Sequence, residues 1–334
     1  MNRNPTIDIL RGIAILAVVL DHAWFLYPQF QITHLWHQTY FSIPWFIFLS
    51  GMTNTLSLEK HHFRLNVSSY LRFLVKRFFL LIPYFLACII IFLILNYPNL
   101  NWSQWIHDVL YFSFQPTFYY VNLILQLYLI SPVLFTTLMI CQSRKKQWGL
   151  LLSVIVVTGI LVYIGIPPWP FSPAARLFGG IYLSVFFLGM LFSETSIQKN
   201  SILPLISLVL FLISEGILLG TNAGLPGFAQ TVLYNFWAIS LLVIAFILLS
   251  NYPKLSCRVS FLSLLGKHSY IIYLFHFFLL QRLARYFIIS SIPIFLGLMA
   301  VSIFIPLIIS ILFSEIINLF HFPIKSFVSK TVAL

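Results

Sequence analysis

The feature that most constrains this chain is a series of long apolar runs. Ten stretches of about 20 residues, each nearly free of charged side chains, recur along the 334 residues. A helix of about 20 apolar residues is long enough to cross the hydrocarbon core of a membrane. The apolar residues are continuous rather than alternating, which disfavours a β-barrel. The runs cover approximately residues 8–27, 40–58, 78–95, 119–140, 149–166, 175–193, 202–220, 231–250, 268–289 and 293–318.

The composition excludes an ordinary soluble domain. Hydrophobic residues make up 60% of the chain and charged residues only 8%, and the mean hydropathy is +0.97. A globular core of this size needs far less apolar side chain, because its surface must stay in contact with water. We therefore expect an all-α, polytopic integral membrane protein with about ten transmembrane helices. It forms one transmembrane domain over residues 1–334, with no cleavable signal peptide and no appended soluble domain.

The basic residues indicate the orientation in the membrane. The net charge is +12, and most lysines and arginines fall before the first run, after the last, or in alternate connections between them. The positive-inside rule then places both termini in the cytoplasm. Because the charges are explained by topology, they do not point to nucleic acid. These residues are Arg3, Lys60, Arg64, Arg72, Lys76, Arg77, Arg144, Lys145, Lys146, Lys199, Lys254, Arg258, Lys267, Lys325 and Lys330.

The longest outer connection, about residues 96–118, is aromatic and nearly uncharged. It contains the stretch NWSQWIHDVLYFSFQP. Such a segment is typical of an amphipathic piece that lies along the membrane interface. Its aromatic side chains suit either an interfacial belt or stacking on sugar rings, and we favour the belt.

The first run carries two ionisable residues on one face. Arg11 and His22 are eleven positions apart, which is about three turns of a helix and roughly 16 Å of rise. Ionisable groups within a membrane are costly and usually face a polar cavity. A guanidinium at the inner end can hold phosphates, and an imidazole further out can take a proton from a hydroxyl. The alternative is that Arg11 only anchors the helix and His22 hydrogen-bonds a carbonyl.

Other polar residues give weaker signals. Asp21 points about 100° away from His22 around the helix, so it is not expected to orient that imidazole. His34 and His37 have no carboxylates or thiols nearby in the sequence, so we expect no metal site. His276 lies within the ninth run, where it either lines a cavity opposite His22 and contacts a substrate or bonds within the bundle.

Several stretches, taken in order, resemble the acyltransferase-3 family of integral membrane acyltransferases. They are IDILRGIAILAVVLDH (7–22), PWFIFLSGM (44–52), YLRFLVKRFFLLIPYF (70–85), FYYVNLILQLYLISPVL (118–134), FGGIYLSVFFLGMLF (178–192) and LGKHSYIIYLFHFFLL (265–280). Arg11 and His22 occupy the places of an arginine and a histidine in the family's first helix. Many members carry two arginines three residues apart before the Ile-Pro step. Here Arg77 fits the first place and Leu80 stands at the second.

The resemblance implies an O-acyltransferase in a bacterial plasma membrane. It would move an acyl group, in the first instance acetyl, from cytoplasmic acyl-CoA to a hydroxyl of an extracytoplasmic or lipid-linked glycan, of the exopolysaccharide type. Acyl-CoA is a co-substrate, no cofactor is tightly bound, and membrane proteins of glycan synthesis are expected partners. His22 is the expected catalytic residue, as general base or acyl carrier. Arg11, Arg72, Arg77 and His276 are the expected donor-binding or substrate-binding residues.

Two other function classes remain open at this point. Ten helices with buried ionisable groups also suit a transporter of a glycan or small metabolite, although the two halves of the chain show no internal symmetry. A non-catalytic membrane scaffold would leave His22 and Arg11 replaceable. Release of CoA in the presence of the protein separates the enzyme from both.

Overall fold

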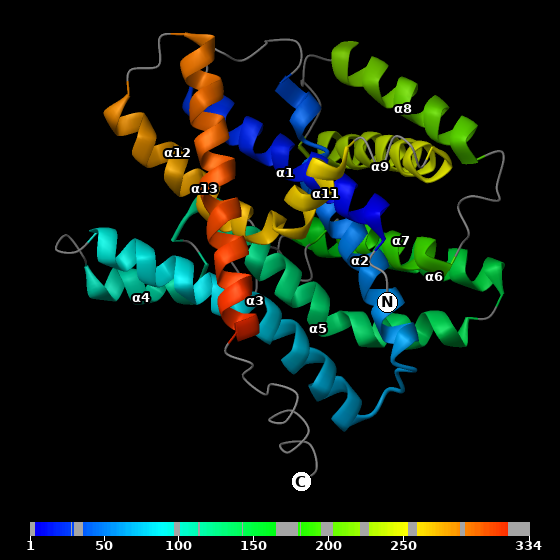
Figure 1. Cartoon of the computed structure of the whole chain (residues 1–334). Coiled ribbons are helices and arrows are strands. Elements are labelled where there is room, and N and C mark those ends of the chain that lie inside the picture. The colour runs from blue at the N-terminus through cyan, green and yellow to red at the C-terminus, as the bar shows by residue number, and fades with distance from the viewer. Residues whose placement is uncertain are drawn as a thin grey trace. The chain divides into compact units, whose positions relative to one another are not determined.

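The computed structural model consists of helices wherever the chain is described. The described residues are 4–27, 29, 36–96, 101–112, 114–141, 143–164, 180, 182–194, 203–220, 227–252, 259–287 and 291–319. Within these ranges the chain forms α-helices and two short 3-10 helices and no strand (Figure 1). The all-α class predicted from the sequence is therefore confirmed.

The helices fall into two groups in chain order. The first group is α1 (Pro5–Leu26), η2 (Trp36–Thr39), α2 (Ser42–Lys60), α3 (Val67–Asn96), α4 (Trp102–Leu110), η3 (Pro116–Phe118) and α5 (Tyr119–Ile140). The second group is α6 (Arg144–Ile164), α7 (Tyr182–Glu194), α8 (Leu203–Gly220), α9 (Gly227–Asn251), α11 (Ser260–Lys267), α12 (Ser269–Tyr286) and α13 (Ile292–Leu319).

Each of the ten predicted apolar runs falls on a helix. Parts of four runs, namely residues 165–166, 175–179 with 181, 202, and 288–289, lie outside the described residues. Six helices are long and apolar enough to cross a membrane, namely Pro5–Leu26, Val67–Leu95, Tyr119–Ile140, Leu203–Gly220, Val232–Asn251 and Ile292–Glu315. A multi-pass membrane protein follows from these six. The number of ten spans and the cytoplasmic position of both termini stay predictions.

The chain divides into two compact units. The first unit comprises Met1–Ser50 and Glu194–Phe313, and the second comprises Gly51–Ser193 and Ser314–Leu334. The boundary falls inside α2, so residues 42–50 belong to the first unit and the rest of that helix to the second.

In the first unit, α1 lies against α11 and also contacts α12 and α9 (Figure 1). The sequence permits this close packing because glycines stand at the crossing. A methyl group on Gly12 would overlap the backbone oxygen of Leu262, and one on Gly266 would overlap the backbone oxygen of Asp8. Small residues let membrane helices approach closely, since dispersion contacts between backbones hold them together.

The start of α1 and the joint between α11 and α12 are fixed by side chains. The Asn4 side chain accepts a hydrogen bond from the backbone N–H of Thr6 (3.0 Å), and Pro5 occupies the first helical turn. Between α11 and α12, Nδ1 of His268 lies 2.7 Å from Oγ of Ser310 on α13. The cap holds the first turn of α1, and the His268 contact ties the joint between α11 and α12 to α13.

In the second unit, α3 packs against α5. The Tyr70 hydroxyl of α3 donates to the backbone oxygen of Leu129 on α5 (2.7 Å). Phe63, in the connection before α3, makes edge-to-face contacts with Phe73 of α3 and Phe135 of α5. The basic first half of α3 is thereby held beside α5.

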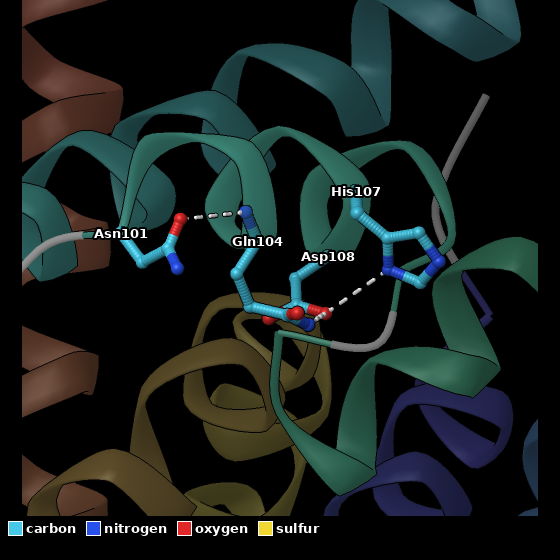
Figure 2. Close-up of polar contacts among 4 residues, drawn as sticks. All are labelled: Asn101, Gln104, His107 and Asp108. Atoms are coloured by element: carbon cyan, nitrogen blue, oxygen red, sulfur yellow. Dashed lines mark hydrogen bonds and ion pairs between the residues drawn. The ribbon is translucent and has the colours of Figure 1, made fainter.

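The predicted interfacial segment contains the short helix α4, drawn in Figure 2. Asn101 caps the helix by accepting from the backbone N–H of Gln104 (3.3 Å), and Gln104 donates to Asp108 (2.9 Å). The exposed apolar side chains of Trp102, Ile106 and Leu110 recur every four residues and therefore lie along one face of the helix. The amphipathic helix is confirmed, whereas its position at the membrane interface stays a prediction.

Candidate functional site

The first unit brings His22 and His276 into direct contact. His22 lies four residues before the end of α1, and His276 lies in the middle of α12. Nδ1 of His22 is 2.8 Å from Nε2 of His276, and the ring centroids are 5.0 Å apart. These residues are 254 positions apart in the chain. Of the candidate residues that the sequence singles out, these two therefore form a hydrogen-bonded pair.

His276 is enclosed and engaged through both ring nitrogens. Its side chain is 0% exposed. Its Nδ1 lies 2.7 Å from the backbone oxygen of Tyr273 and 3.1 Å from that of Ile272, one turn earlier on the same helix. Its Nε2 faces His22. Buried polar groups are normally hydrogen-bonded, and His276 follows this rule at each nitrogen.

His22 is the more accessible member of the pair. Its side chain is partly exposed, and the edge of the Phe277 ring packs against it at a centroid distance of 5.1 Å. Nδ1 bonds His276, and the ring also interacts with the backbone of Val18, one turn earlier on the same helix. The imidazole is thus held by the protein at Nδ1, while its side chain stays partly exposed.

Asp21 has a separate partner, as its position on the helix predicts. Its Oδ1 accepts a hydrogen bond from Oγ1 of Thr39 in η2 (2.8 Å). The imidazole of His22 is therefore oriented by another histidine and not by the neighbouring carboxylate. Arg11 lies on the same helix three turns before His22 and is partly exposed.

The second unit contains the other two basic candidates, Arg72 and Arg77, both on α3. The guanidinium carbon of Arg77 is 5.3 Å from the ring centroids of Phe73 and of Tyr128 on α5, so the cation contacts two aromatic rings. Nη2 of Arg77 is buried and makes no hydrogen bond within the described ranges. Arg72 is exposed. The two arginines therefore differ: only Arg77 has an enclosed donor without an acceptor.

The surroundings of Arg77 are strongly basic. Nζ of Lys76 lies 3.2 Å from Nε2 of His61, which follows α2. The pKa of His61 is lowered from its ordinary value by partial burial and then by the charges of Lys76, Lys60 and Arg77. Leu80, at the place where a second arginine is common, is 55% exposed and supplies no donor. The local field favours an anion.

Sequence reasoning missed the groups that position these side chains. The carbonyl oxygens of Tyr273 and Ile272 hold His276, and the rings of Phe73 and Tyr128 hold Arg77. The two carbonyls could have been predicted from helical spacing, because a histidine can donate to carbonyls three and four residues earlier. The contact with Tyr128 could not, because no local sequence pattern places that residue beside Arg77. The histidines at 34 and 37 cannot be assessed, since their side chains lie outside the described residues.

Comparison with known proteins identifies the family. The model of the acyltransferase-3 family, described as an acyltransferase domain, matches residues 4–312, which include every candidate residue above. No curated protein and no solved structure gives a significant match. The match covers most of the chain in one continuous stretch, and together with six apolar helices it indicates a membrane acyltransferase. The chain belongs to the acyltransferase-3 family.

Proposed function

We propose that this acyltransferase uses acyl-CoA as its donor and the hydroxyl of a glycan as its acceptor. The donor, in the first instance acetyl-CoA, binds from the cytoplasm, and the glycan is extracytoplasmic or lipid-linked. The observation that carries the proposal is the state of His22: its Nδ1 is bound to His276, and its side chain is partly exposed, so the ring is both oriented and accessible. This is the arrangement of a general base or a nucleophile.

The reaction requires one proton transfer in each direction. His22 accepts the proton of the acceptor hydroxyl while the hydroxyl oxygen attacks the thioester carbon. The carbon–sulfur bond breaks, and the thiolate of CoA takes the proton from His22. An acyl ester and CoA result, and His22 returns to its neutral state. In the covalent variant, the same nitrogen first takes the acyl group and then passes it to the hydroxyl.

The donor class is supported by Arg77. CoA carries three phosphate groups, and a guanidinium is the side chain best suited to phosphate. Arg77 presents a buried N–H with no acceptor in the described part of the chain, in a region where lysines add positive charge. Burying a cation without a counter-ion is costly, so this position suits a ligand that brings negative charge. Arg11 and Arg72 are proposed as further contacts to the phosphates.

The test is acyl transfer by the purified protein in lipid nanodiscs with radiolabelled acetyl-CoA and candidate glycans. Wild type is expected to release CoA and label the glycan. His22→Ala should lower the rate by about a thousandfold or more, since general acid–base catalysis contributes about 10²–10⁴. His107→Ala, a change at a histidine on the exposed helix α4, is the matched control and should keep full activity. Glycan transport without CoA release would contradict the proposal.

A further inference from the structure

The hydrogen bonds of His276 determine which nitrogen of His22 can react. We infer that His276 is a positioning residue: it fixes His22 in the tautomer that carries its proton on Nδ1, so that Nε2 is the atom that acts on the substrate. The inference rests on the proposed function, because it names the reactive atom of the proposed catalytic residue. A chain of hydrogen bonds runs from the backbone of α12 through His276 to His22.

The first step is the tautomer of His276. Its Nδ1 faces the carbonyl oxygens of Tyr273 (2.7 Å) and Ile272 (3.1 Å). A carbonyl oxygen only accepts hydrogen bonds, so Nδ1 of His276 must donate and must carry a proton. Because the carbonyls belong to the same helix as the histidine, this assignment follows from local geometry and does not depend on any ligand.

The second step is the tautomer of His22. A neutral imidazole carries one proton, so Nε2 of His276 has a lone pair and accepts. The atom that faces it at 2.8 Å is Nδ1 of His22, which must therefore donate. The proton of neutral His22 is then on Nδ1, and the lone pair is on Nε2. This is the nitrogen that does not face His276.

The other protonation states conflict with the structure. If His276 carried its proton on Nε2, its Nδ1 lone pair would face two carbonyl oxygens in a buried site. If His276 were cationic, a side chain that is 0% exposed would bear a charge with only two carbonyls and one imidazole as partners among the residues described. A buried charge without an opposite charge is strongly disfavoured. Every contact is satisfied when both histidines are neutral and each carries its proton on Nδ1.

This arrangement also serves the reaction after proton transfer. When Nε2 of His22 takes a proton, the ring becomes an imidazolium, and Nδ1–H continues to donate to the lone pair of His276. The bond keeps the ring from rotating and stabilises the positive charge that forms. With both of its nitrogens engaged, His276 does not contact the substrate, so a positioning role replaces the substrate contact that the sequence suggests.

Two amide variants separate this role from a structural one. In His276→Gln, the side-chain amide stands near the former Nε2, so its oxygen can accept from His22. In His276→Asn, the amide stands near the former Nδ1, so it can bond the carbonyls of Tyr273 and Ile272 but not reach His22. A residue needed only for packing or helix stability would tolerate Asn at least as well as Gln. A residue that fixes the tautomer requires Gln.

We expect His276→Gln to keep kcat within about tenfold of wild type and His276→Asn to lose about a hundredfold or more, with the KM for the acyl donor unchanged in both. An imidazole held in the wrong tautomer can lose about four orders of magnitude in rate. Equal losses in the two variants, with equal thermal stability in detergent, would overturn the inference. So would full activity of His276→Asn.

The tautomer can also be read without turnover. Nitrogen-15 NMR of histidine-labelled protein distinguishes the two ring nitrogens, and the signals of His22 are assigned by their loss in His22→Gln. We expect wild type and His276→Gln to show His22 protonated on Nδ1, and His276→Asn to show a mixture of tautomers. Protonation of wild-type His22 on Nε2 would refute the inference even if acyl transfer were robust. A wild-type protein that transfers no acyl group refutes the proposed function instead, and the NMR result stands apart from it.

Discussion

The two polar centres of this chain are built on opposite principles. In the first unit, the histidine pair uses three of its four ring nitrogens for bonds within the protein. In the second unit, Arg77 contacts two aromatic rings, yet a buried N–H has no acceptor in the described ranges.

The difference indicates different tasks. A centre with satisfied internal bonds holds its geometry before any ligand arrives, which is what a chemical step needs, since preorganised groups require no rearrangement during reaction. A partly buried cation whose enclosed N–H has no acceptor is destabilised until an anion binds, which is what a binding position needs. The first centre should therefore be sensitive to geometry and the second to charge.

The largest predicted effect tests the geometric sensitivity of the first unit. Gly266→Ala places a methyl group against the backbone oxygen of Asp8, so α1 and α11 must separate and the joint into α12 must shift. Overpacking of this kind costs about 1–3 kcal/mol. We expect that loss in the free energy of unfolding, together with at least a hundredfold loss of acyl transfer, measured by thermal unfolding in detergent and CoA release.

Gly297→Ala is the matched control in the same unit, because nothing lies within 4 Å of the added methyl group. It should leave both the unfolding temperature and the rate close to wild type. If Gly266→Ala behaved like this control, the close crossing would not be what positions His276 beside His22.

The next effect tests the charge sensitivity of the second unit. Arg77→Gln removes the enclosed guanidinium and should raise the KM for acyl-CoA by about 10–100-fold with little change in kcat, because a hydrogen bond to a charged group contributes about 1.5–3 kcal/mol. Arg72→Gln, at an exposed position of the same helix, should change that KM by less than about threefold. Steady-state kinetics over a range of donor concentrations measure both.

The source of the anion at Arg77 can be identified by changing the lipid. If donor phosphate binds there, the contrast between Arg77→Gln and Arg72→Gln is the same in nanodiscs of zwitterionic and of anionic lipid. If a lipid headgroup binds there, Arg77→Gln and Arg72→Gln should have similar KM values for the donor. The two variants should then differ in how their activity responds to anionic lipid.

The sequence predicted what depends on local composition. Each apolar run became a helix, because a continuous run of this length can satisfy its backbone in a membrane only as a helix. The helix α11 (Ser260–Lys267) was not predicted, since eight residues are too few for a membrane-crossing run. Within the candidate site, the residue types were identified, and His276 was placed opposite His22 as one of two interpretations.

What could not be predicted depends on contacts between distant segments. The 2.8 Å contact of His22 and His276 depends on how α12 leaves α11, and that in turn depends on Gly266 meeting Asp8. The stacking of Arg77 on Tyr128 depends on the packing of α3 against α5. In both cases the side chain was visible in the sequence, but its partner was set by a helix crossing that no local pattern encodes.

The smallest predicted effect uses His61 as a reporter of the basic centre. Its pKa is lowered by partial burial and by the charges of Lys76, Lys60 and Arg77. The folded protein therefore favours neutral His61, and this contribution to stability is present above the ordinary pKa of histidine and is lost as the pH falls through the lowered value. Between pH 7 and pH 5, the unfolding temperature of wild type should therefore fall slightly more than that of His61→Gln. Because His61 is exposed, this difference should be small and should shrink further in salt.

The same residue can report occupancy of Arg77. An anion bound beside Arg77 offsets the positive field, so adenosine 3′,5′-bisphosphate, which carries phosphates of the kind present in CoA, should raise the pKa of His61 toward its ordinary value in an NMR titration. In Arg77→Gln the ligand-induced rise should be much smaller, because the principal binding group is gone. An equal rise in both proteins would show that the phosphate binds elsewhere. Arg77 would then not be an anion-binding position, and only the description of the histidine pair as preorganised would stand.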